Sequence, residues 1–239
     1  MSYRWHGGGD TADVIPAAAA LELMHDFVLI HDDIIDESST RRGAPALHTA
    51  LAQSLTAGRG GDDCCKRGRN QALVAGDILY SMAVNCFLDT RVPAAACQQA
   101  LRFLLSSAIQ TGVGEIRELD LDLVALNQLD GENILENYDR KTGLYTFVNP
   151  LVVGALLAGC DDSIQPPLRK VGLALGRAYQ IADDVSDVAS FGEAANALPS
   201  DILQRRRTNL LYLTYRNAAE ADRTWLDRVY GESTPVSLQ

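Results

Sequence analysis

The feature that most restricts the fold is a pair of matching acidic segments, each directly after an apolar run. The first reads HDDIID at 31–36 and the second reads ADDVSD at 182–187. Both place aspartates at i, i+1 and i+4, and in a helix the side chains at i and i+4 are neighbours. Apolar surroundings indicate burial, and a buried carboxylate without a partner is very costly. The fold must therefore supply a counter-charge to both segments.

A hard divalent cation suits this spacing best. Two carboxylates about 4 Å apart repel each other by about 4 kcal/mol at an effective dielectric constant of about 20. A shared proton relieves that repulsion, but Mg²⁺ relieves it better, and it favours a few carboxylates combined with substrate phosphate oxygens. One acidic helix face is usually solvated, whereas two such faces opposed across one pocket would need cations. The predicted metal ligands are Asp32, Asp33, Asp36, Asp183, Asp184 and Asp187.

Two arginines, Arg41 and Arg42, follow the first acidic segment closely. Alone, such a pair is more often a surface feature than a site. Beside a metal cluster, however, their planar guanidinium groups offer forked donors that match phosphate oxygens. Metal on one side and guanidinium on the other predict a clamp for a diphosphate.

The rest of the chain predicts one all-α domain over residues 1–239. Apolar residues make up 47% of the sequence, they recur at helical spacing, and convincing strand alternation is absent. Helical patterns cover 16–36, 71–88, 93–112, 131–159, 165–189 and 199–230, and a glycine- and charge-rich loop is expected at 56–70. Several core helices are apolar almost all round.

Charge and composition exclude some classes of protein. The net charge of −10 argues against a nucleic-acid partner, because nucleic acid requires a basic face. Five cysteines without a CxxC pair indicate a reduced compartment. The N-terminus lacks the apolar core of a signal peptide, and the longest apolar run falls far short of the roughly 20 residues that span a bilayer. We expect a cytoplasmic protein without stable membrane insertion.

In their order along the chain, these motifs resemble those of the trans-isoprenyl diphosphate synthases, the polyprenyl synthetases. Arg41-Arg42-Gly43, Pro45 and His48 follow the first acidic motif, and Tyr179-Gln180 precedes the second. Between them, GDILYSMA at 76–83 and KTGLYTF at 141–147 are similar to the family's GD and KT segments. The resemblance covers about residues 15–211 and implies a bundle of long antiparallel helices around a central apolar cavity. It also implies a homodimer.

The resemblance implies a magnesium-dependent condensation of an allylic diphosphate with isopentenyl diphosphate. Three Mg²⁺ ions would bridge both acidic motifs, hold the allylic diphosphate and stabilise pyrophosphate as it leaves. The double bond of isopentenyl diphosphate would attack the resulting allylic cation, and proton loss would give a longer all-trans prenyl diphosphate of geranylgeranyl or farnesyl type. No nucleophilic side chain is required, which agrees with finding no Ser/His or Cys/His signature.

Individual roles follow from the same resemblance. Contacts to the allylic diphosphate are implied for Lys141, Gln180 and Arg41. The Thr142 hydroxyl and the dipoles of Lys141 and Gln180 would face the allylic cation.

Isopentenyl diphosphate would be held by Arg42 and His25, and a core role for His25 is an equally good interpretation. Phe27 and Val28 lie one helical turn before the first acidic motif. In this family, bulky side chains there stop the growing chain, and this pair resembles geranylgeranyl-type enzymes more than farnesyl-type ones.

The chain departs from the family pattern where isopentenyl diphosphate would bind. The family's N-terminal helices carry a Gly-Lys-x-x-Arg segment that has no convincing equivalent here. Ala197-Leu198-Pro199 stands where the family has Gly-Lys-Pro, and Arg206 replaces the later phosphate-binding lysine, before Thr208. Three interpretations remain: an elongating synthase, a synthase-like terpene cyclase that ionises an allylic diphosphate without a second substrate, and a non-catalytic subunit that modulates an active partner.

Three more acidic residues, Glu118, Asp120 and Asp122, lie in the segment EIRELDLDL. Their helical angles scatter them, so we expect a solvated or interface face there and no metal ligands.

Overall fold

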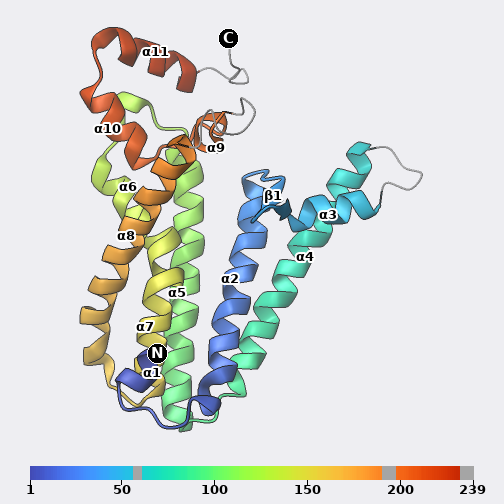
Figure 1. Cartoon of the computed structure of the whole chain (residues 1–239), viewed down its shortest axis with the longest axis vertical. Helices are drawn as coiled ribbons and strands as arrows, with labels where there is room; N and C mark the ends of the chain where they lie inside the picture. The colour runs from blue at the N-terminus through green and yellow to red at the C-terminus, as the bar shows by residue number, and fades with distance from the viewer. Residues whose placement is uncertain (56–60, 190–197, 232–239) are drawn as a thin grey trace. The chain divides into compact units, whose positions relative to one another are not determined.

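Helices make up nearly all the regular structure of the computed structural model, which describes residues 1–55, 61–189 and 198–231 (Figure 1). The elements in chain order are α1 (Ser2–Trp5), η1 (Thr11–Val14), α2 (Ile15–Ile35), β1 (Thr40–Arg41), β2 (Ala44–Pro45), α3 (Leu47–Ser54), α4 (Gly61–Leu88), α5 (Ala94–Leu121), η2 (Leu126–Gln128), α6 (Gly131–Tyr138), η3 (Asp139–Val148), α7 (Asn149–Leu157), η4 (Asp162–Ile164), α8 (Gln165–Ala189), α9 (Ser200–Leu203), α10 (Asn209–Asn217) and α11 (Glu220–Gly231). The predicted all-α class is confirmed.

The chain divides into two compact units. The first contains Met1–Leu101 and Gly154–Cys160, and the second contains Arg102–Val153 and Asp161–Gln239. The first acidic motif belongs to the first unit, and the second acidic motif belongs to the second unit.

In the first unit, α2 packs along α4 (Figure 1). Four alanines from these two helices are at most 1% exposed: Ala17, Ala20, Ala72 and Ala83. Gly76 gives the closest approach, since a Cβ atom there would lie 2.3 Å from Nε2 of His31. The glycine of the GD segment therefore makes room for the histidine that begins the first acidic motif.

Helix α4 begins at Gly61, so the loop predicted at 56–70 is wrong from that residue onward. Asp62 and Asp63 lie in the first turn, where negative charge is favourable. A Cβ atom at Gly68 would lie 2.4 Å from the backbone oxygen of His48 in α3. Gly68 thus allows α3 and α4 to pack closely. A composition rich in glycine and charge does not by itself distinguish such a helix from a loop.

In the second unit, α8 packs on the π-helix η3, which joins α6 to α7. A Cβ atom at Gly176 would lie 2.5 Å from Cα of Gly143, so the two backbones touch. The helix predicted at 131–159 is thus interrupted by a rare π-helical segment, a form often found at functional sites. That segment contains Lys141 and Thr142.

The single helix predicted at 199–230 is wrong, because three short helices occupy that range. The chain turns at Arg205, whose φ is +56°. The Thr208 side chain then caps α10 by accepting a hydrogen bond from the Leu211 amide at 3.2 Å. Ala197 of the expected Gly-Lys-Pro position lies outside the described residues.

Among the described residues, two stretches are long and apolar enough to cross a membrane, Thr11–Ile35 and Gly61–Leu88. Each is longer than the roughly 20 residues that span a bilayer. Core helices of soluble proteins meet the same test of length and composition, and these two helices pack against each other in the first unit.

Candidate functional site

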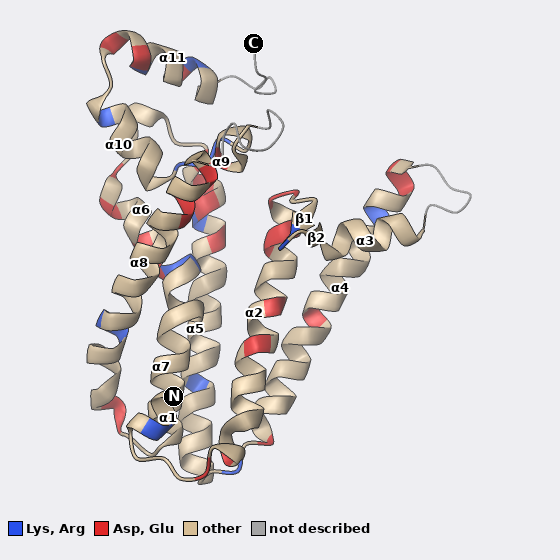
Figure 2. Ribbon diagram, in the orientation of Figure 1, with Lys and Arg blue, Asp and Glu red and all other residues tan. Residues whose placement is uncertain are grey.

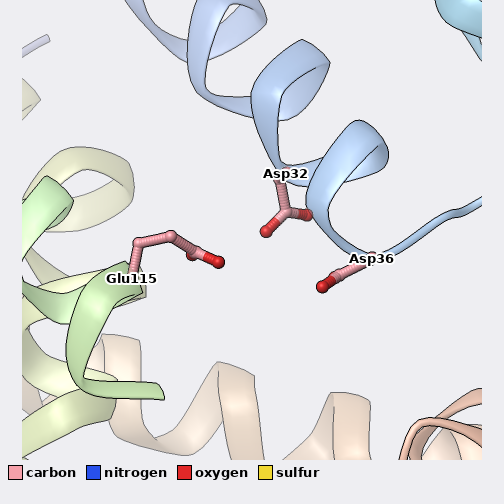
Figure 3. A group of neighbouring side chains, drawn as sticks. All are labelled: Asp32, Asp36 and Glu115. Carbon is pink, nitrogen blue, oxygen red and sulfur yellow. The ribbon is translucent and has the colours of Figure 1, made fainter. Parts of the chain in front are cut away.

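The first acidic motif ends α2 and presents two of its carboxylates together. Asp32 and Asp36 are one turn apart, and Figure 3 shows both side chains at this end of the helix. They offer oxygen atoms within 4.8 Å of each other. Both side chains are half-buried, which suits a cation that also binds an anion from outside. Glu115, also labelled in Figure 3, comes from α5 in the second unit.

A short hairpin returns Arg41 to this motif. The loop residues Arg42 and Gly43 have φ values of +53° and +78°, which is typical of a two-residue type I′ turn. Arg41 donates from Nε to Oδ1 of Asp33 at 2.9 Å, and its Nη2 lies 3.4 Å from Oδ2 of Asp32. Asp33 is only 4% exposed. Arg41 is therefore the counter-ion of the motif, whereas Arg42 is exposed.

The predicted chain-length residue Phe27 lies at the contact between α2 and α4. Its ring centroid is 4.8 Å from that of His31 and 5.3 Å from that of Tyr80 in α4, both in edge-on arrangements. Val28 and His25 are half-buried on α2. The roles predicted for these residues stay predictions.

One face of α8 positions the second acidic motif. Gly172 and Gly176 touch η3 on this face. Gln180 and Asp184 follow at the same spacing of four residues, so they lie on the same face of the helix. Asp184 is accordingly buried, at 4% exposure, while Asp183 is exposed. The close packing of the two glycines thus decides which aspartate of the motif points inward.

The Asp184 carboxylate accepts hydrogen bonds on both oxygens. Oδ2 accepts from the Tyr138 hydroxyl, and Oδ1 accepts from Nε2 of Gln180 at 3.1 Å. Burial raises the pKa of Asp184, and these hydrogen bonds oppose the rise. Gln180 uses its other amide atom, Oε1, to accept from the Thr142 hydroxyl at 2.7 Å. The structure thus brings together Thr142 and Gln180, and the role predicted for them stays a prediction.

Asp187, the last aspartate of the motif, caps α9. Its Oδ2 accepts from the Asp201 amide at 3.0 Å, and its Oδ1 accepts from the Ser200 hydroxyl at 3.1 Å. Burial, together with the charges of Asp187 and Asp184, raises the pKa of Asp201 to about 7. Acidic residues gather at this end of α8 (Figure 2). The mutual repulsion of these carboxylates favours a bound cation.

Lys141 is held by two carboxylates of α5. Its Nζ lies 3.0 Å from Oε2 of Glu115 and also forms a short ion pair with Glu118. The lysine side chain is 20% exposed, so it stays within reach of a ligand. The two carboxylates fix the position of this ammonium group and oppose its charge.

Arg206 is buried beside the same helix, at 8% exposure. Its Nη1 lies 2.8 Å from Oδ2 of Asp122 and 3.5 Å from Oε2 of Glu118. The prediction of a solvated or interface face is therefore wrong for Glu118 and Asp122, whose spacing at i and i+4 was the available signal. Burial raises the pKa of Glu118 to about 7 and that of Asp122 to about 6. Asp120 is exposed.

Known proteins share this sequence pattern. A family model described as Polyprenyl synthetase matches residues 1–237. A geranylfarnesyl diphosphate synthase from Natronomonas pharaonis is 34% identical over 201 residues, which are 84% of this chain and 53% of the relative. A geranylgeranyl diphosphate synthase from Methanosarcina mazei is 30% identical over 219 residues, 90% of this chain and 61% of the relative. The chain thus spans less than two thirds of the length of these curated relatives.

Solved structures share the fold. A geranylgeranyl pyrophosphate synthetase from Pyrococcus horikoshii has a TM-score of 0.77 at 26% identity, with 97% of this chain and 65% of that chain covered. A geranylgeranyl pyrophosphate synthase from Corynebacterium glutamicum, crystallised with isoprenyl diphosphate and magnesium, has a TM-score of 0.79 at 29% identity. That match covers 93% of this chain and 63% of the other.

Proposed function

The chain belongs to the polyprenyl synthetase family, and we propose that it is a magnesium-dependent trans-prenyltransferase. It would condense an allylic diphosphate with isopentenyl diphosphate to give a longer all-trans prenyl diphosphate, of geranylgeranyl or farnesyl type. One observation carries the proposal. Each acidic motif lies near a helix end, where its own unit supplies a hydrogen-bond donor to it, Arg41 for the first motif and Tyr138 and Gln180 for the second. The named relatives favour this activity over the cyclase and the modulating subunit.

Both motifs suit a hard cation. Asp32 and Asp36 offer neighbouring oxygens, and Asp183 and Asp187 are one turn apart on α8. Together with Asp33 and Asp184, they are the proposed ligands of three Mg²⁺ ions bound with the diphosphate. When bound, Mg²⁺ would supply Lewis-acid stabilisation of the leaving pyrophosphate.

Positive side chains would bind the same anion. Arg41 and Lys141 are each paired with carboxylates, and their guanidinium and ammonium groups are hydrogen-bond donors of the kind that bind phosphate oxygens. Arg206 is the third proposed contact, and Arg42 and His25 are proposed to hold isopentenyl diphosphate. The exposure of Arg42 is compatible with a ligand that enters from solvent.

Thr142 and Gln180 would stabilise the allylic cation with oriented dipoles. The Thr142 hydroxyl donates its proton to Gln180, so the lone pairs of Thr142 Oγ1 remain to face positive charge. Such fixed dipoles cost no reorganisation during the reaction.

We further propose that the protein is a cytoplasmic homodimer and that Phe27 and Val28 limit product length. The position of Phe27 between His31 and Tyr80 supports a fixed aromatic side chain at that place.

A product assay tests the proposed function. The protein would be incubated with Mg²⁺ and geranyl or farnesyl diphosphate, with and without isopentenyl diphosphate, and products would be identified by mass. Longer diphosphates formed only when isopentenyl diphosphate and Mg²⁺ are both present are the expected result. Hydrocarbons made without isopentenyl diphosphate would point to the cyclase, and turnover only after addition of a homologous chain would point to the subunit.

A further inference from the structure

We propose that Tyr138 is a positioning residue of this site. Its hydroxyl holds Asp184, and through Asp184 and Gln180 it sets the direction of the Thr142 hydroxyl. The inference rests on the function proposed above for Thr142. Tyr138 precedes the KT segment by three residues, and its hydroxyl makes hydrogen bonds to Asp184 and Asn209.

The direction of each hydrogen bond around Tyr138 is determined by its neighbours. The Asn209 amide of α10 donates to the Tyr138 oxygen at 2.8 Å, and an amide can only donate. Tyr138 therefore uses its single proton for Oδ2 of Asp184, in a short hydrogen bond. Tyr138 is 7% exposed and Asp184 is 4% exposed, so water does not compete for this contact. The phenol thus holds the carboxylate in one orientation.

Asp184 transmits this orientation to Gln180. Its Oδ1 accepts from Nε2 of Gln180 at 3.1 Å, which requires the amide nitrogen to face the carboxylate. The amide oxygen must then face the other way, where it accepts from the Thr142 hydroxyl at 2.7 Å. If the Asp184 carboxylate rotated, Nε2 of Gln180 would lose its acceptor. The amide could then flip, and its oxygen would no longer face the Thr142 hydroxyl.

Both oxygens of Asp184 thus accept from donors of its own unit, which fix the carboxylate near the end of α8. Tyr138 also connects α6, α8 and α10, because its oxygen joins Asp184 to the first residue of α10.

The test is Tyr138→Phe, which removes the hydroxyl and keeps the ring. We expect kcat to fall by about tenfold, since a buried hydrogen-bond acceptor loses its donor, and KM for the allylic diphosphate to rise, since the acidic motif that binds it is no longer held in place. The matched control is Tyr215→Phe, which removes a hydroxyl that donates to Asp227 at 3.1 Å in the same unit. The control should retain the wild-type kcat.

A double-mutant cycle with Thr142→Val separates positioning from general structural support. If Tyr138 acts through Thr142, the double variant should be no slower than the slower single variant. Additive losses in kcat, or a Tyr138→Phe enzyme within twofold of wild type, would overturn the inference.

A binding measurement keeps the inference testable if the product assay refutes the proposed function. Calorimetry would measure the affinity of wild type and of both tyrosine variants for pyrophosphate with Mg²⁺. A loss of about tenfold in affinity for Tyr138→Phe alone would support positioning of the acidic motif. That factor corresponds to the strength of one hydrogen bond to a charged group. Equal affinities for all three proteins would overturn it.

Discussion

Asp33 and Asp184 hold the same place in their two motifs, and each is 4% exposed. Both occupy position i+1 of their motif. This position is rotated by about 100° from position i, so it lies off the helix face that positions i and i+4 share. Each of these aspartates has a donor from its own unit, Arg41 for the first and Tyr138 for the second. The second aspartate of each motif is thus held in place by a donor from its own unit.

At this scale, Asp32→Asn and Asp183→Asn should each abolish product formation. The apo protein should keep its free energy of unfolding, or gain slightly, because each change removes repulsion between neighbouring carboxylates. Asp120→Asn, at an exposed position on α5, is the control for loss of one negative charge. Chemical denaturation and the product assay would be run on the same preparations. An unstable variant that kept its activity would contradict the metal assignment.

The packing of whole elements sets the geometry of the second unit. Helix α8 approaches η3 at Gly143 and Gly176, and this contact places Gln180 beside Thr142. The end of α5 adds Glu118, which joins Lys141 in η3 to Arg206 in the connection between α9 and α10. The site therefore depends on four segments, which one glycine contact and one ion network hold together.

Gly176→Ala tests the helix contact. The added methyl would lie 2.5 Å from Cα of Gly143, where only backbone could move away. We expect a loss of about 1–3 kcal/mol in the free energy of unfolding, typical of overpacking, and a fall in kcat. Gly112→Ala is the matched control, since among the described residues nothing beyond the backbone of its own helix lies within 4 Å of the added Cβ. It should stabilise the protein by about 0.5–1 kcal/mol through helix propensity.

The buried acids of α5 predict how stability depends on pH. The pKa of Glu118 is raised to about 7 and that of Asp122 to about 6, so the folded chain holds protons that the unfolded chain has already released. Stability should therefore fall as pH rises from about 5 to 8. Denaturation of the apo protein at several pH values would measure this slope.

Glu118→Gln should reduce that slope, because it removes one of the two groups. Glu220→Gln, at an exposed position on α11, should leave the slope unchanged. A Glu118→Gln protein with the full wild-type slope would show that this carboxyl does not titrate as burial predicts.

For the molecule as a whole, the proposed function requires both acidic motifs to serve one diphosphate, although each belongs to a different unit. A ligand that binds only the folded protein raises stability by about 2.7 kcal/mol at a hundred times its dissociation constant. Mg²⁺ and pyrophosphate together should therefore raise Tm, whereas pyrophosphate with a chelator should not.

If the motifs share one ligand, Asp32→Asn and Asp183→Asn should each remove the rise in Tm. Thermal unfolding followed by circular dichroism would measure it. A full rise in either variant would show that its motif is not needed to bind the ligand.

The sequence by itself determined the all-α class, the family and the bounds of α8, because helical periodicity and motif spacing are local properties of the chain. Only the tertiary structure decided that Glu118 and Asp122 turn inward, that α4 starts at Gly61, and that Tyr138 reaches Asp184. Each of these depends on a neighbour far away in the chain. Periodicity specifies which residues share a helix face, whereas long-range packing selects the partner that this face meets.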